Sequence, residues 1–247
     1  MHKLVLICLL FLAVGLVGCD MNAKEEFDSS AGASTRAQPA KAYWAEKWWI
    51  PRHEQKIKDS QNKNYDVVIF GDSIVHKFET DGLKSWQALN QNYSILNLGF
   101  SGDMTEHVLW RIQNGELKYV SPSKVILMVG TNNTGLRFDS AQDTLLGIQL
   151  IVKEIQAIIP ETNIIIIGLL PRSRKPSHKF RVRNQEVNRL LHSWIKSNSM
   201  LSYENIETEF LDNQGVISKE IMPDALHLSE FGYEILSQSL QLILEGE

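Results

Sequence analysis

The chain has 247 residues, of which 43% are hydrophobic and 22% are charged, and these proportions are ordinary for a globular protein. Its net charge of -4 gives no basic surplus, so the composition argues against nucleic acid as a partner. Both cysteines, Cys8 and Cys19, lie within the first 20 residues. The rest of the chain therefore has no disulfide and no thiolate ligand for a metal.

The N-terminus has the pattern of a secretory signal. A basic start at residues 1–3 precedes an apolar run over residues 4–17. The run is shorter than the roughly 20 residues that span a bilayer. It ends in Leu-Val-Gly-Cys, which resembles the lipobox of bacterial lipoproteins, so we expect residues 1–18 to be removed and Cys19 to be lipidated. A plain membrane anchor, or cleavage elsewhere, is the alternative.

Residues 19–40 are expected to hold the lipidated cysteine and a flexible tether. They are rich in Ala, Ser, Lys and Glu and contain almost no large apolar residue, which is typical of a chain that cannot form a core. Asp20 resembles the inner-membrane retention signal of enterobacterial lipoproteins, a rule that varies between bacteria. We expect a domain over residues 41–247, tethered to a membrane on the periplasmic or extracytoplasmic side of a bacterial envelope.

Three tryptophans, Trp44, Trp48 and Trp49, lie within six positions at the start of this domain. Their spacing fits an aromatic face on a helix that is interrupted or restarted at Pro51. We expect this segment to be clamped onto the domain. Membrane contact or a carbohydrate-binding platform is the functional alternative.

Strands and helices are predicted to alternate through the domain. The strands are short apolar runs that end at Gly or Pro in most cases, at residues 66–70, 93–98, 124–129, 163–170 and within 201–211. The helices are at residues 105–116, 139–159, 180–197 and 229–244. This alternation predicts one α/β domain with a parallel sheet of about five strands and helices on both faces, a three-layer sandwich.

Ser73 directly follows the first strand, in Gly71-Asp72-Ser73. Open α/β sheets bind their ligands at the carboxyl ends of the strands, so a nucleophile is expected there. The same three residues are also common in turns. A serine becomes a nucleophile only where a neighbouring base takes its proton, and that base must itself be oriented.

His227 is the histidine best placed to be that base. The other six lie in the signal, in charged segments or on predicted helices, whereas His227 lies in a loop three residues after Asp224. One ring nitrogen could then bond the Asp224 carboxylate while the other faces Ser73. A turn-capping aspartate beside a packed histidine is the structural alternative, and a metal site lacks a third ligand.

Ester hydrolysis also needs donors for the oxyanion. Gly99 ends the second strand, where a backbone N–H can approach a ligand closely. Asn132 brings a side-chain amide just past the third strand. Ordinary turn roles are the alternative for both residues.

These four stretches in this order resemble the four blocks of the SGNH (GDSL) hydrolase superfamily. The resemblance implies a flavodoxin-like fold and no metal or organic cofactor. It implies that Ser73 is the nucleophile, His227 the general base and then acid, and Asp224 the group that orients His227. The oxyanion hole would comprise the N–H groups of Ser73 and Gly99 with the side chain of Asn132.

The resemblance is most detailed to the catalytic subunits of intracellular platelet-activating-factor acetylhydrolase. It rests on residues 97–103, 107–117, 129–133 and 168–172. Those subunits form dimers, so a homodimer is an open expectation. The lipoprotein-like leader is a departure from these cytosolic subunits, and Asn133 departs from the superfamily's usual Gly-x-Asn-Asp but agrees with them.

Three functions are carried forward from the sequence. The first is a serine esterase for short acyl groups, O-acetyl in particular, acting through an acyl-enzyme on Ser73. The second is a lysophospholipase or thioesterase for longer acyl chains. The third is a non-catalytic lipoprotein that binds surface glycans through the tryptophans.

Overall fold

The computed structural model describes residues 32–195 and 200–246. The predicted signal at residues 1–18, the lipidation site Cys19 and most of the tether lie outside the described residues. In the described part, no helix combines the length and apolar character that crossing a membrane requires.

A parallel sheet of five strands forms the centre of the domain, in the order β2-β1-β3-β4-β5. The strands are β1 (Val67–Gly71), β2 (Ile95–Gly99), β3 (Lys124–Met128), β4 (Asn163–Ile167) and β5 (Leu201–Glu204). Gly71 is in register with Gly99 on one side and Met128 on the other, so the carboxyl ends of β2, β1 and β3 meet at one edge. The predicted fold class is confirmed.

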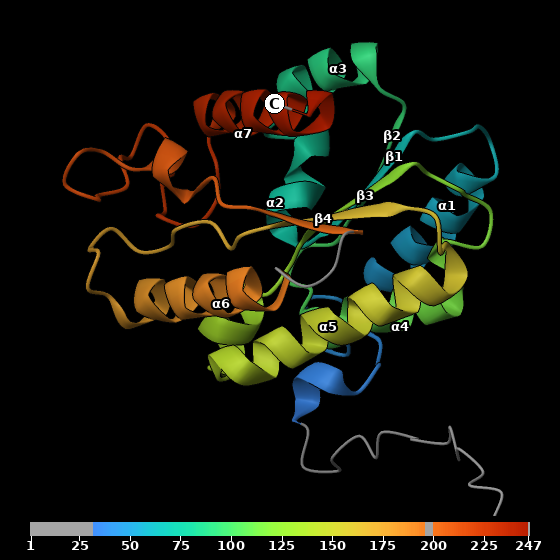
Figure 1. The fold of residues 1–247 in the computed structure, drawn as a ribbon, viewed down its shortest axis with the longest axis horizontal. Coiled ribbons are helices and arrows are strands. Elements are labelled where there is room, and N and C mark those ends of the chain that lie inside the picture. Colours follow the sequence, from blue (N-terminus) through green and yellow to red (C-terminus); the bar gives the residue numbers. More distant parts are fainter. Residues whose placement is uncertain (1–31, 196–199, 247) are drawn as a thin grey trace, which may run out of the picture. The chain divides into compact units, whose positions relative to one another are not determined.

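Helices cover both faces of this sheet (Figure 1). The α-helices are α1 (Trp49–Ser60), α2 (Ser73–His76), α3 (Leu83–Asn92), α4 (Thr105–Arg111), α5 (Ala141–Ile158), α6 (Lys179–Ile195) and α7 (Glu230–Glu245). Short 3₁₀ turns are η1 (Ala33–Thr35), η2 (Lys77–Glu79) and η5 (Glu207–Phe210), and π turns are η3 (Ile112–Glu116) and η4 (Asn133–Arg137). Figure 1 shows α2, α3 and α7 on one side of the sheet and α4, α5 and α6 on the other.

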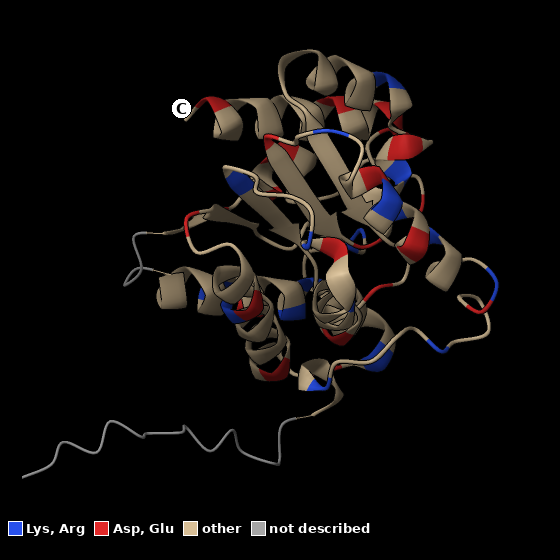
Figure 2. Ribbon diagram, turned by 90° about the vertical axis from the view of Figure 1, so that its right-hand side faces the viewer, with Lys and Arg blue, Asp and Glu red and all other residues tan. Residues whose placement is uncertain are grey.

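Two apolar cores follow from the alternation of side chains along each strand. In β1, Val68 and Phe70 pack into the core shared with α4, α5 and α6. Val67 and Ile69 point the other way, into the core shared with α3 and α7. Because both faces are covered, most strand residues are apolar, and Figure 2 shows few charged residues on the sheet. Asn97 is a polar exception within β2, and the charged residues Lys124 and Glu204 lie at strand ends.

Two predicted elements end earlier in the structure than in the sequence analysis. The helix predicted over residues 105–116 stops at Arg111 and continues as the π turn η3, in which Gly115 has φ +103°. Such a φ is readily adopted only by glycine. The fourth strand ends at Ile167, because the Leu169 N–H leaves the sheet to bond the Asn188 side chain at 2.7 Å.

The tryptophan segment is clamped onto the domain. Trp49 begins α1 and is fully buried, and its indole N–H donates to Asp103 Oδ1 at 2.6 Å. Trp48 stacks on Phe100, with ring centroids 6.3 Å apart. Trp44 is half-buried against Gly102, just beyond β2. The aromatic rings therefore cover the loop after β2.

Candidate active site

Ser73 lies at the carboxyl edge of the sheet, between β1 and α2. Gly71 is needed there, because a Cβ at Gly71 would lie 2.3 Å from Val75 Cγ2 and 2.8 Å from the Met128 carbonyl. Asp72 then caps α2, accepting a hydrogen bond from the Ile74 N–H at 3.0 Å. The tight turn presents Ser73 as the first residue of α2.

Ser73, His227 and Asp224 form one chain of hydrogen bonds. Ser73 Oγ lies 3.0 Å from His227 Nε2, and His227 Nδ1 lies 2.7 Å from Asp224 Oδ2. When His227 Nδ1 carries the proton and donates it to the Asp224 carboxylate, Nε2 is free to accept the serine proton. The three residues that the sequence singled out are thus brought together across 154 positions of chain.

Asp224 is held in its ionised form. Burial opposes this, but the hydrogen bonds from the His227 ring and from the N–H groups of His227 and Leu226 outweigh it and lower the pKa of Asp224. Asp224 Oδ1 accepts both N–H groups, at 2.7 Å from His227 and 3.0 Å from Leu226. One carboxylate therefore fixes both the loop and the ring.

The loop that carries Asp224 and His227 is tied to the segment after β4. Ala225 adopts φ +62°, and its carbonyl accepts the Ser173 N–H at 2.8 Å. Arg174 donates to the carbonyls of Met222 and Pro223 at 3.3 and 2.7 Å. These bonds hold an unusual backbone conformation for a residue other than glycine.

Asp72 is buried beside this chain. Desolvation raises the pKa of Asp72 to about 6, against the opposing effects of the Ile74 N–H and the charges of His227 and Arg172. Its side chain caps α2 and is directed to the backbone. The geometry gives it a structural role in placing Ser73.

Asn132 lies at the same edge of the sheet, after β3. It is 4% exposed, and its Nδ2 donates to the Asp103 carbonyl at 3.0 Å. An amide nitrogen carries two hydrogens, so one remains for a ligand. This bond also joins the loop after β3 to the loop after β2.

Gly99 does not have the geometry that the sequence analysis expected of an oxyanion donor. Its N–H already donates to Asn97 Oδ1 at 2.8 Å. The glycine has another explanation, because a Cβ there would lie 2.2 Å from the His76 nitrogen where β2 packs on α2. The glycine at the strand end thus reflects close packing.

Within the described part of the chain, Gly102, and not Gly99, has a free backbone N–H in the loop after β2, although the sequence did not single it out as an oxyanion donor. It has φ +83°, and its N–H has no acceptor among the described residues. It directly precedes Asp103, whose carbonyl is bonded to Asn132. The sequence does contain a signal for Gly102, because Ser101-Gly102-Asp103 has the composition of a turn and glycine readily adopts positive φ there.

Asn133, which replaces the superfamily's usual aspartate, has a structural role. It is fully buried, and its Oδ1 accepts the Thr105 N–H at 3.1 Å. Its amide nitrogen donates to Ser34 Oγ and Asp139 Oδ2 at 3.2 and 3.1 Å. An aspartate could not make these donations unless it were protonated.

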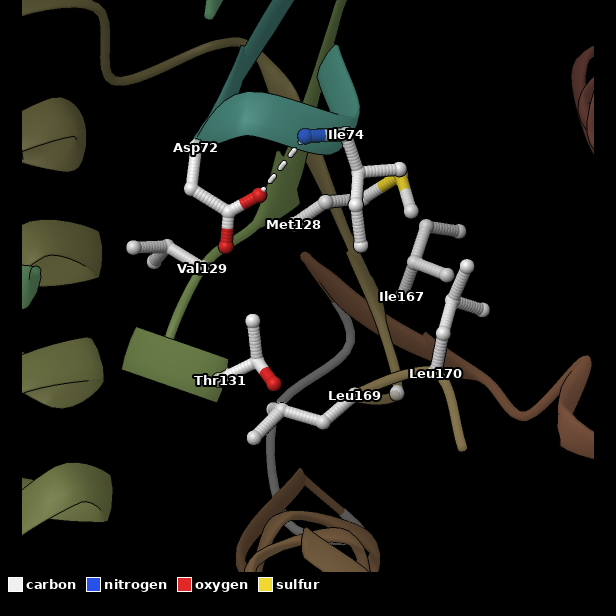
Figure 3. Close-up of a pocket in the computed structure, with 9 residues that line it drawn as sticks. Asp72, Ile74, Met128, Val129, Thr131, Ile167, Leu169 and Leu170 are labelled. Carbon is white, nitrogen blue, oxygen red and sulfur yellow. Dashed lines mark hydrogen bonds between the residues drawn. The ribbon is translucent and has the colours of Figure 1, made fainter. Parts of the chain in front are cut away.

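A small cavity of about 20 Å³ lies at the carboxyl ends of β1, β3 and β4, lined by Asp72 and Ile74, the two sequence neighbours of Ser73. Figure 3 shows its lining from the ends of β1, β3 and β4: Asp72, Ile74, Met128, Val129, Thr131, Ile167, Leu169 and Leu170, with Gly168 completing it. Most of these side chains are apolar. The volume holds about one water-sized group. In the described part of the chain, no three His, Cys, Asp or Glu side chains are grouped to hold a metal ion.

His76 supports the loop after β2 in its neutral form. Its Nδ1 accepts the Ser101 N–H at 3.1 Å, which only an unprotonated nitrogen can do. Burial, followed by the charge of Arg52, lowers the pKa of His76 to about 4; Lys56 acts in the same sense and Glu79 opposes it. Protonation of His76 would therefore release this loop.

We expect His76 to make folding stability depend on pH. Because its folded pKa lies below the unfolded value, its contribution is complete above about pH 6.5 and is lost as the pH falls toward 4. Between pH 7 and 5, wild type should lose on the order of 1 kcal/mol more than His76→Gln, after allowance for solvent screening. Urea unfolding at both pH values measures this, and equal losses would contradict it.

The model of the GDSL-like lipase/acylhydrolase family matches residues 69–235. The platelet-activating factor acetylhydrolase IB subunit alpha1 of Homo sapiens is 34% identical over 196 residues, covering 79% of this chain and 82% of that subunit.

Solved structures agree with the fold. A GDSL-like lipase from Bacteroides thetaiotaomicron has a TM-score of 0.63 at 16% identity, covering 78% of this chain and 97% of that chain. A mutant of an acetyl-xylooligosaccharide esterase from Geobacillus has a TM-score of 0.60 at 16% identity, covering 76% and 97%. On the family match and the identity to the human subunit, this chain belongs to the GDSL-like lipase/acylhydrolase family and is a carboxylic-ester hydrolase.

Proposed function

We propose that the protein is a serine esterase that removes short acyl groups, O-acetyl in particular. The hydrogen-bond chain from Ser73 through His227 to Asp224 carries this proposal. Ser73 Oγ attacks the ester carbonyl while His227 Nε2 takes its proton. His227 then gives that proton to the departing alcohol, and an acyl group remains on Ser73. Water, activated by His227, releases the acid.

Three donors are proposed for the oxyanion. Ser73 is the first residue of α2, so its N–H has no acceptor within the helix. The second donor is the remaining amide hydrogen of Asn132. The third is the N–H of Gly102, in place of Gly99, whose N–H is bonded to Asn97. Each fixed donor of this kind lowers the barrier by about 3 kcal/mol in serine hydrolases.

The cavity lined by Asp72 and Ile74 is the proposed acyl site. Ile74 and Thr131, which line it, are neighbours in sequence of Ser73 and Asn132. A volume near 20 Å³ admits a methyl-sized group and excludes a long chain. The acetylhydrolase and acetyl-esterase names of the similar proteins agree with this preference.

The acyl preference is tested with 4-nitrophenyl esters from acetate to octanoate. We expect kcat/KM to fall at least about tenfold with each methylene beyond propionate, because the apolar lining would have to move. A preference for octanoate would contradict the proposal and favour the lysophospholipase or thioesterase. Ser73→Ala provides the blank rate for every ester.

The proposed location is a bacterial envelope, with the domain anchored by lipid on Cys19. This part rests on the leader and its lipobox-like end, residues 1–19. Labelling of cells with a radioactive fatty acid tests it. Label in the full chain and none in Cys19→Ser would support the anchor, and equal label in both would contradict it.

A further inference from the structure

Residues 172–183, termed the basic segment, reverse the charge of the chain locally. Six of these 12 residues are Lys or Arg and none is Asp or Glu, although the whole chain has a net charge of -4. The cations are Arg172, Arg174, Lys175, Lys179, Arg181 and Arg183. They run from the end of the β4 loop into the first turns of α6.

None of the six cations forms an ion pair with a carboxylate within residues 32–195 and 200–246. Their hydrogen bonds go to uncharged groups. Arg172 donates to the Thr131 carbonyl at 2.6 Å, and Arg181 to the Ser173 carbonyl at 2.5 Å. Arg111, the other buried arginine of the described residues, is by contrast paired with Asp103 at 2.9 Å. The basic segment therefore keeps its charge uncompensated at close range.

Two of the six cations are buried: Arg181, which is 1% exposed and donates to three backbone carbonyls, and Arg172, which is 8% exposed. A buried charge is costly unless it is paired. Burial lowers the pKa of Arg172, while the more distant charges of Asp72 and Asp224 oppose that effect. Its Nη1 is bonded to Thr131, and no described residue accepts a hydrogen bond from its Nε or Nη2.

The basic segment borders the active site on two sides. Arg172 bonds the residue before Asn132, and Ser173 bonds Ala225, two residues before His227. In Figure 1 the loop between β4 and α6 runs on the same side of the molecule as the loop that leads into α7. Lys175 and Lys179 are exposed, so this border is open to a ligand.

The six cations are not placed to bind a charge on the acyl part of the substrate. The cavity proposed for it has about 20 Å³ and a mainly apolar lining, so a charged acyl group would be buried without its water. With the acyl group in this cavity, the alcohol part of the ester would extend away from it, toward the surface. A charge on the alcohol can therefore reach the basic segment.

We propose that the basic segment binds a carboxylate or phosphate on the alcohol part of the ester substrate. The proposal rests on the esterase function proposed above and narrows its substrate class to acylated anionic alcohols. Arginine forks and lysine charges suit both anions. A border of one charge sign also raises the rate of encounter with an oppositely charged substrate.

The test compares three acetyl esters of similar size: acetylated galacturonate, acetylated glucose 6-phosphate and an acetylated neutral methyl galactoside. Acetate release gives kcat/KM for each at low and high salt. Lys175→Gln/Lys179→Gln removes two exposed charges of the basic segment. Lys58→Gln/Lys153→Gln is the matched control, since both lysines are exposed on α1 and α5.

For wild type at low salt, we expect kcat/KM for at least one anionic ester to exceed kcat/KM for the neutral ester by about tenfold. This ratio of kcat/KM values should fall at high salt. That ratio should drop several-fold in Lys175→Gln/Lys179→Gln and stay at the wild-type value in the control. The carboxylate and phosphate arms identify which anion is preferred.

The inference would be overturned if wild type had nearly equal kcat/KM for the anionic and neutral esters. It would also be overturned if the ratio of these values dropped equally in both double variants. Hydrolysis of 4-nitrophenyl acetate separates this failure from that of the proposed function. If wild type hydrolyses that neutral ester but shows no preference for anionic esters, the proposed esterase function is retained and the role of the basic segment is rejected. Absence of any turnover by folded wild type rejects both.

Discussion

Replacing Ser73 by alanine is expected to lower kcat/KM for 4-nitrophenyl acetate by at least about 10³-fold, because the acyl-enzyme can no longer form. Stability should change by less than about 1 kcal/mol, since the Ser73 side chain bonds only His227 Nε2 among the described residues. Ser193→Ala is the matched control, because Ser193 Oγ is exposed and bonds the Arg189 carbonyl on α6. Initial rates and urea unfolding measure both effects.

An organophosphonate ester probe tests the same serine without turnover. Intact-protein mass spectrometry should show one adduct on wild type, localised to Ser73 and absent from Ser73→Ala. His227→Ala should label far more slowly, because Ser73 Oγ then lacks the base 3.0 Å away. Undiminished hydrolysis by Ser73→Ala would refute the nucleophile.

The sequence predicted those parts of the fold that depend on local pattern. Apolar runs such as residues 66–70 became strands because burial on both faces demands continuous apolar character. The spacing of Asp224 and His227 predicted their contact, because three residues of one turn suffice to close it. The contact of Ser73 with His227 was predicted only from the resemblance to the SGNH hydrolases, because the two residues are 154 positions apart and no local pattern brings them together.

Other features depend on contacts that one sequence does not encode. Gly99 and Gly102 look alike as turn glycines, and only the side chain of Asn97 decides which N–H is occupied. The helix α3 was not predicted, although Trp86 and Leu89 lie on one face of it. Its segment is short and polar, and packing against α7 stabilises it.

The buried charges behind the β2 loop were likewise invisible in the sequence. Arg111 is fully buried, and its Nε donates to Asp103 Oδ2 at 2.9 Å while Nη1 bonds Glu116. Its guanidinium lies 3.9 Å from the centre of the Phe100 ring. Asp103 also accepts the Trp49 indole, and its carbonyl bonds Asn132. One arginine therefore links the tryptophan segment to the proposed oxyanion site.

Replacing Arg111 by methionine is expected to destabilise the fold by about 3–5 kcal/mol at neutral pH, because the buried carboxylates of Asp103 and Glu116 lose their counter-charge. Arg189→Met is the control, because its pair with Glu186 is exposed to solvent and should contribute little to stability. Urea unfolding of both variants measures the difference, and equal losses would contradict the assignment.

The pH dependence of Arg111→Met identifies the cause of its destabilisation. In wild type, burial already raises the pKa of Asp103 to about 7, and the charge of Arg111 opposes that rise. Without the arginine the pKa of Asp103 rises further, so the folded variant takes up a proton at a pH where folded wild type does not. Its deficit against wild type should therefore shrink as the pH falls from about 9 toward 7. A deficit that stays constant over this range would indicate lost packing on Phe100 as the cause, because packing does not titrate.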